Sequence, residues 1–138
     1  MSRRDTYHNI VKQALIREGW TITHEQYSFD TDPQLSTDLG AEKMIAAIRK
    51  QEKIAVEIKS FLAESQVSEL EKAVGQYGLY RRFLKIQEPA RKLYLAVPFH
   101  AFENIFNREV GQIAIEEFDL KLIVFSISSE KPLLWHPK

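Results

Sequence analysis

The stretch Ile-Ala-Val-Glu-Ile-Lys at residues 54–59 constrains the fold more than any other part of this sequence. Its β-branched residues alternate and its charges fall on one side only, which is typical of a buried β-strand. Successive side chains of a strand point to opposite faces, so Val56 and Ile58 share one face while Glu57 and Lys59 share the other. The sequence therefore predicts a carboxylate and an ammonium side by side at the end of an otherwise apolar strand.

Length and composition predict one globular domain that spans residues 1–138. Apolar residues make up 44% of the chain and charged residues 28%, which excludes a disordered protein. The absence of cysteine excludes disulfides and thiolate metal sites and fits a reducing cytosol, so we expect a cytoplasmic protein. No signal peptide is visible and the apolar runs are too short to span a bilayer, so no membrane partner is expected. The formal net charge is zero, which argues against an extensive basic surface but permits one basic face.

The segment of residues 37–48 is the hardest to assign. Residues 41–48 have a helix-forming composition, but the polar residues 49–52 lead directly into the strand at 54–59, as in a hairpin. We predict mostly strand for residues 37–48, with helix as the alternative.

Hydrophobic periodicity predicts an α-β-β-β-α-β order followed by short helices and strands. Asp5 is the expected N-cap of the first helix and Gly19 its end, while Ser68 fits a capping box of the long helix and Glu88-Pro89 ends it. Early strands joined by hairpins pair antiparallel, and a strand that follows a helical crossover pairs parallel. We therefore expect an α/β (α+β) fold with a mixed sheet flanked by helices. The predicted helices span residues 5–18, 65 or 68 to 85, 102–106 and 109–118, and the predicted strands span 20–24, 37–48, 54–59, 93–97, 120–125 and 133–136.

A second acid, Asp38, precedes the Glu57-Ile58-Lys59 triplet and gives the arrangement D…ExK. Hydrolysis of a phosphodiester needs an activated water and a cation that stabilises charge on the phosphate, and Mg²⁺ or Mn²⁺ held by one or two carboxylates provides both. Asp38 and Glu57 supply the carboxylates, the main-chain carbonyl of Ile58 is a third candidate ligand, and Lys59 is a candidate to orient or deprotonate the attacking water. A Glu-x-Lys triplet alone is more often a solvated surface pair. The aliphatic neighbours, Asp38 and the long helix that follows favour a site.

The long helix carries Gln76 and Tyr80, which share one helical face because they are four residues apart. An amide and a phenol there are candidates to reach a metal, a phosphate or a base; the alternative puts Tyr80 in the core and Gln76 on the surface. Arg81 and Arg82 are candidate phosphate contacts, although basic residues near a helix C-terminus also complement its dipole. Glu18 is a candidate third carboxylate, and an ordinary surface position is the favoured alternative.

The D…ExK motif and the following QxxxY motif resemble those of the PD-(D/E)xK nuclease superfamily, in its RecB-like branch. More closely, the whole chain resembles the XisH family of fdxN element excision controlling factor proteins. This likeness is carried by residues 14–24, 38–43, 54–61, 75–77 and 93–98.

The resemblance implies a restriction-endonuclease-like fold, with Asp38 and Glu57 as metal ligands and Lys59 as the catalytic lysine. Thr37 stands where the superfamily motif has proline, a departure that the superfamily tolerates. The resemblance also implies site-specific excision of a DNA element, with DNA, a recombinase and a small XisI-type protein as partners.

Two function classes remain open. The first is a Mg²⁺- or Mn²⁺-dependent DNA endonuclease, favoured by the intact Asp38, Glu57 and Lys59. The second is a catalytically silent accessory that binds DNA or a recombination partner, favoured by the zero net charge and by the regulatory label of the family. A homodimer is compatible with both.

Overall fold

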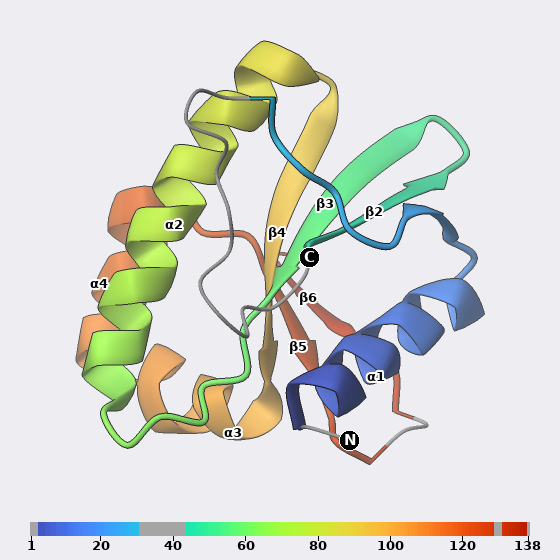
Figure 1. Ribbon diagram of the computed structural model, residues 1–138. Coiled ribbons are helices and arrows are strands. Elements are labelled where there is room, and N and C mark those ends of the chain that lie inside the picture. The colour runs from blue at the N-terminus through green and yellow to red at the C-terminus, as the bar shows by residue number, and fades with distance from the viewer. Residues whose placement is uncertain (1–2, 31–43, 129–130, 138) are drawn as a thin grey trace.

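The structure is a computed structural model in which residues 3–30, 44–128 and 131–137 are described. Within these residues, six strands form one sheet in the order β1-β2-β3-β4-β5-β6 (Figure 1). None of the described helices combines the length and the apolar composition that a membrane span requires. The elements are α1 (Arg3–Arg17), β1 (Thr21–His24), β2 (Met44–Arg49), β3 (Glu52–Ile58), α2 (Gln66–Gln87), β4 (Arg91–Pro98), α3 (Phe99–Ala101), the π-helix η1 (Phe102–Phe106), α4 (Glu109–Phe118), β5 (Leu122–Phe125) and β6 (Leu134–His136).

The sheet is mixed, as predicted. Strands β1, β2 and β3 pair antiparallel, β3, β4 and β5 pair parallel, and β6 runs antiparallel to β5. Helix α2 connects the parallel strands β3 and β4, which confirms the α-β-β-β-α-β order. The carboxyl ends of β3, β4 and β5 therefore lie at the same end of the sheet.

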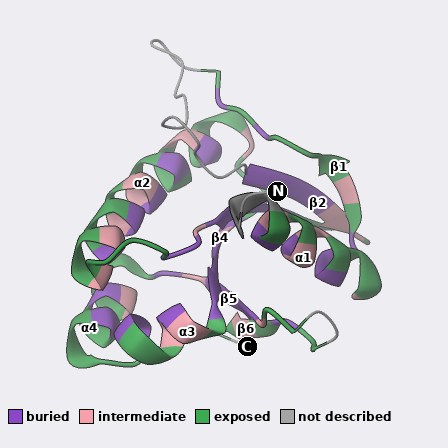
Figure 2. Cartoon of the chain, turned by 60° about the horizontal axis from the view of Figure 1, so that its bottom comes forward, coloured by how far each residue is buried: buried purple, intermediate pink, exposed green. Residues whose placement is uncertain are grey.

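Two hydrophobic cores cover the two faces of the sheet. Helix α1 packs on one face through Tyr7, Val11 and Leu15, whereas α2, η1 and α4 pack on the other. In Figure 2 the central strands are buried along nearly their whole length, while the helices alternate buried and exposed residues. Burial on both faces explains why residues 44–48 form a strand despite their helix-forming composition. The strand prediction is confirmed for this part, and residues 37–43 lie outside the described residues.

One predicted helix start was wrong, and one of two alternatives for another start was confirmed. Helix α1 begins at Arg3, so Asp5 lies within its first turn and is not the N-cap. Helix α2 is capped by Ser65, whose side chain accepts a hydrogen bond from the Ser68 amide, so the predicted start at residue 65 is confirmed and Ser68 is not the N-cap. The predicted split near Asn107 is confirmed, with η1 on one side and α4 on the other.

Tyr77 joins α2 to β4 and to the residue that precedes β5. Its buried hydroxyl donates a hydrogen bond to the Leu93 carbonyl at 3.1 Å and accepts one from the Lys121 amide at 3.2 Å. Burial raises the pKa of Tyr77, so the phenol stays protonated and available as a donor.

Replacing Tyr77 with phenylalanine is expected to lower the free energy of unfolding by about 2–3 kcal/mol, because two backbone groups lose their partner inside the protein. Urea unfolding measures this loss. Tyr94→Phe is the matched control, because the Tyr94 ring packs edge-on against Trp135 and supplies most of its contact. Equal stability of Tyr77→Phe and wild type would contradict the bridging role.

The C-terminal end of α2 holds the segment that follows β1. The Glu88 carboxylate accepts hydrogen bonds from Tyr27 at 2.7 Å and from two nitrogens of the buried Arg91, at 3.0 and 3.2 Å. Arg91 also donates to the Ile54 carbonyl at 2.9 Å. The Arg91 bonds, and next the Tyr27 bond, hold the pKa of Glu88 below its ordinary value of 4.5.

This network is expected to make stability depend on pH. Because the folded-state pKa of Glu88 is lowered, its contribution is present above the unfolded-state pKa and is lost as the pH falls through the folded value. Glu88→Gln should therefore be less stable than wild type at pH 7, and the difference should shrink towards pH 3 in urea unfolding. Glu71→Gln, on the exposed side of α2, should match wild type at pH 7. A Glu88→Gln deficit that is the same at both pH values would contradict the assignment.

Candidate functional site

Glu57 is a buried acid near the carboxyl end of β3. Its Cα lies between those of Met44 on β2 and Leu95 on β4, and both of these residues belong to the core under α2. The residue is 4% exposed. A carboxylate is seldom buried to this extent without a charged partner or a ligand.

Lys59 lies beside this acid, as the strand alternation predicted. Its Nζ is 3.9 Å from Oε2 of Glu57, and its side chain is 14% exposed. The Lys59 amide donates to the Ala96 carbonyl at 2.9 Å, so the backbone continues the ladder with β4 for one residue beyond β3. The ammonium is therefore held at the end of the sheet where the parallel strands β3, β4 and β5 terminate.

The chain turns sharply after Lys59. Ser60 and Phe61 are both buried, and Phe61 adopts a left-handed backbone with φ of 52°. Its ring meets Phe106 of η1 edge-on at 5.4 Å between centroids, and its carbonyl accepts a hydrogen bond from the Gln66 side chain. A non-glycine residue in this conformation costs about 1 kcal/mol or more and persists only where the surroundings enforce it. Sequence reasoning missed this turn, because a left-handed backbone is expected at glycine and phenylalanine gives no such signal.

The two candidates on α2 have different surroundings. Tyr80 lies in the core under α2 and stacks on Phe29 with 5.3 Å between ring centroids, as the core alternative described. Gln76 is half-buried, and its Oε1 is buried without a hydrogen-bond donor among the described residues. The amide oxygen of Gln76 is therefore a stronger candidate to contact a ligand than the Tyr80 ring.

The arginines of α2 also differ. Arg81 donates to the Phe118 carbonyl at the end of α4, and its guanidinium lies 5.2 Å from the centre of the Tyr77 ring. It thus joins α2 to α4, a role that sequence reasoning did not assign. Arg82 is exposed at the surface, so its contact with phosphate stays a prediction.

Glu18 lies away from Glu57. Its carboxylate accepts hydrogen bonds from the Leu133 amide at 2.9 Å and from the Trp135 indole at 3.1 Å, and so holds β6. Its carbonyl accepts a bond from Arg49, which is next to the β2–β3 turn at the opposite end of β3. Trp135 packs on the α1 face of the sheet, whereas Glu57 lies beside Met44 and Leu95 of the core under α2, so the structure does not bring Glu18 to Glu57.

Asp38, the remaining candidate ligand, lies outside the described residues. Within the described ranges, no three carboxylate or imidazole side chains converge on one point. The prediction that Asp38 shares a cleft with Glu57 and Lys59 stays a prediction.

Comparisons with known proteins agree on one family. Residues 1–132 match the family model described as XisH protein. Two crystal structures each superpose with a TM-score of 0.84. One is an XisH family protein from Nostoc punctiforme PCC 73102, 36% identical, covering 94% of this chain and 98% of its own. The other is an fdxN element excision controlling factor protein from Anabaena variabilis, 38% identical, covering 95% of this chain and 98% of its own.

No protein with a curated description matches the chain. The family match nevertheless spans nearly its whole length, and both solved structures share its fold at well over 30% identity. The chain therefore belongs to the XisH family.

Proposed function

We propose that this protein acts on DNA in the site-specific excision of a DNA element, by metal-dependent hydrolysis of a phosphodiester. Membership of the XisH family and the likeness to an fdxN element excision controlling factor support the excision role. The observation that carries the hydrolytic part is the buried pair of Glu57 and Lys59. DNA, a site-specific recombinase and a small XisI-type protein are the partners in this proposal.

The energetics of the pair favour a functional role. Burying a carboxylate and an ammonium costs several kcal/mol for each ion, and their attraction offsets this only when the geometry is excellent. Lys59 Nζ lies 3.9 Å from Glu57 Oε2, which is within ion-pair range but beyond hydrogen-bond length. Apolar residues would fill this place in the core at lower cost, which supports retention of the charges for chemistry.

The donor atoms at this end of the sheet suit a hard cation. Glu57 is a buried carboxylate, and the structure has no thiolate, so Mg²⁺ or Mn²⁺ fits better than a soft metal. In this proposal Glu57, Asp38 and the Ile58 carbonyl would hold the ion, and the ion would supply positive charge next to the scissile phosphate. Lys59 orients the attacking water or holds the phosphate through its ammonium.

A catalytically silent accessory is the second candidate. Glu18 and Arg81, two candidate residues of a DNA-cleaving site, instead bind the β6 segment and α4. A scaffold that keeps the buried pair for binding alone, to DNA or to a recombination partner, is consistent with those contacts.

A plasmid-nicking assay separates the two candidates. Supercoiled DNA should be nicked with Mg²⁺ or Mn²⁺ and not with EDTA, and Glu57→Gln should abolish the activity. Glu52→Gln is the matched control, because Glu52 is an exposed acid at the other end of β3. If wild type binds DNA in a salt-dependent manner but never cuts it, with any divalent ion or with its partners, the accessory function replaces the enzyme. Absence of DNA binding even at low salt would contradict the enzyme and would leave only an accessory that binds a recombination partner.

A further inference from the structure

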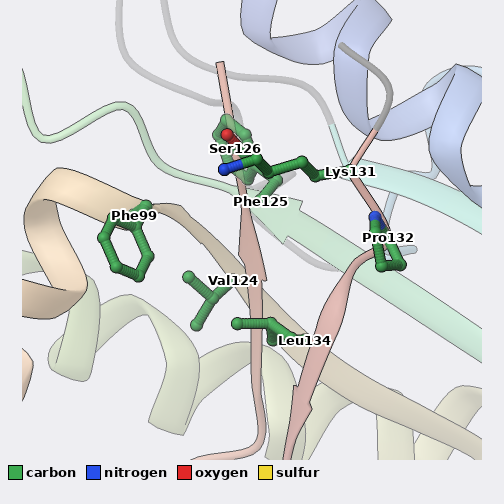
Figure 3. Close-up of a pocket in the computed structure, with 7 residues that line it drawn as sticks. All are labelled: Phe99, Val124, Phe125, Ser126, Lys131, Pro132 and Leu134. Carbon is green, nitrogen blue, oxygen red and sulfur yellow. The ribbon is translucent and has the colours of Figure 1, made fainter. Parts of the chain in front are cut away.

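A pocket of about 310 Å³ lies where β5 ends, between α3 and β6 (Figure 3). This volume is at the lower end of the range for ligand pockets, about 300–1,000 Å³. Phe99, Val124 and Leu134 supply apolar walls, while Ser126 and Lys131 supply the polar atoms. Glu57 and Lys59 do not line it, so this is a second site.

Large apolar side chains are exposed around the pocket. Phe99 is 46% exposed and Leu134 is 55% exposed, and both line it. Ile127, directly after Ser126, is 53% exposed. One exposed apolar residue is ordinary, but a group of them around a hollow is typical of a protein-binding surface.

The pocket adjoins an open edge of the sheet. Strand β6 pairs with β5 on one side, and its other side pairs with none of the described strands. Such an edge presents unpaired backbone donors and acceptors that can accept one more strand. Leu134 and Val124 are register partners and share a face, so a strand added beside β6 would bring alternate side chains against Leu134 and the pocket.

The opposite edge of the sheet is less suited to such a partner. Strand β1 carries Thr21, Thr23 and His24, all exposed and polar. Its partner strand β2 continues into the polar turn with β3. The combination of an open edge with an apolar pocket is therefore specific to β6 among the described strands.

Charge decides what kind of partner fits. Lys131 is exposed at the pocket, and the lining residues include no acid. A second copy of this chain that met this edge through its own β6 would present the same lysine and would not complement the charge. We propose that β6 and this pocket bind an extended segment of a different protein, which carries a large apolar side chain next to a carboxylate. The apolar side chain enters the pocket and the carboxylate meets Lys131, whether or not the protein cuts DNA.

Selection from a phage-displayed random octapeptide library on the purified full chain tests the proposal. Enriched peptides should combine a large apolar residue with an acid one or two positions away. A synthetic fluorescent copy of the strongest one should bind about tenfold or more weakly to Lys131→Glu. Changing the acid of that peptide to lysine should restore binding to Lys131→Glu. Leu134→Asp should abolish binding.

Matched controls come from the same chain. Leu79→Asp replaces a leucine of α2 that is also 55% exposed, and Lys92→Glu reverses an exposed lysine of β4; both should bind the peptide like wild type. Urea unfolding checks that all four variants are folded. Two outcomes would overturn the proposal: no enriched peptide, or enriched peptides that bind Leu134→Asp equally. If no peptide is enriched but 4-phenylbutyrate binds in the pocket, the pocket is a small-molecule site.

Discussion

Replacement of Lys59 by alanine is expected to reduce DNA nicking by about 10²–10⁴-fold, the usual contribution of a positioned acid–base group. In the proposed site the lysine acts on the water or the phosphate and is not a metal ligand. Binding of Mn²⁺, measured by calorimetry, should therefore be largely intact in Lys59→Ala and weakened in Glu57→Ala.

Lys53→Ala is the matched control for this prediction. Lys53 lies on the same strand, with the same alternation as Glu57 and Lys59, but it is exposed near the opposite end. It should cut DNA like wild type. Cutting by Lys59→Ala at the wild-type rate would point to a contaminating nuclease, and the enzyme proposal would then fail.

Gly111→Ala is expected to destabilise the protein by about 3 kcal/mol or more. A Cβ at this position would lie 2.1 Å from the Ile105 carbonyl oxygen and 2.4 Å from the Phe106 Cα, so α4 rests directly on the backbone of η1. Backbone atoms cannot rotate away as the end of a flexible side chain can, and the two elements would have to separate. Because Phe106 also packs on Phe61, we expect the turn after Lys59 to loosen as well.

Gly75→Ala is the control with the opposite sign. A Cβ at Gly75 meets nothing within 4 Å, and the residue is inside α2, where alanine is favoured over glycine by about 0.5–1 kcal/mol. Urea unfolding should therefore show a loss for Gly111→Ala and a gain for Gly75→Ala. A Gly111→Ala variant as stable as wild type would rule out the close approach of α4 to η1.

Local sequence patterns determined much of the secondary structure, the side chains that share a strand face, and the type of sheet. The alternation in residues 54–59 correctly predicted that Glu57 and Lys59 share a side, because strand geometry leaves only two faces. The 3.6-residue periodicity and the Glu88-Pro89 stop predicted α2 with an end that differs by two residues. The order of helices and strands then restricted the sheet to a mixed one, as the structure has it.

Only the tertiary structure decided which partners the polar side chains have. Glu18 bonds to residues 115 and 117 positions later, and Arg81 to a carbonyl 37 positions later. Phe61 is left-handed because Phe106 and Gln66 hold it, and residues 44–48 are a strand because both of their faces are covered. Periodicity and propensity are encoded within a few neighbouring residues, whereas these partners depend on which distant segments the packed sheet brings into contact.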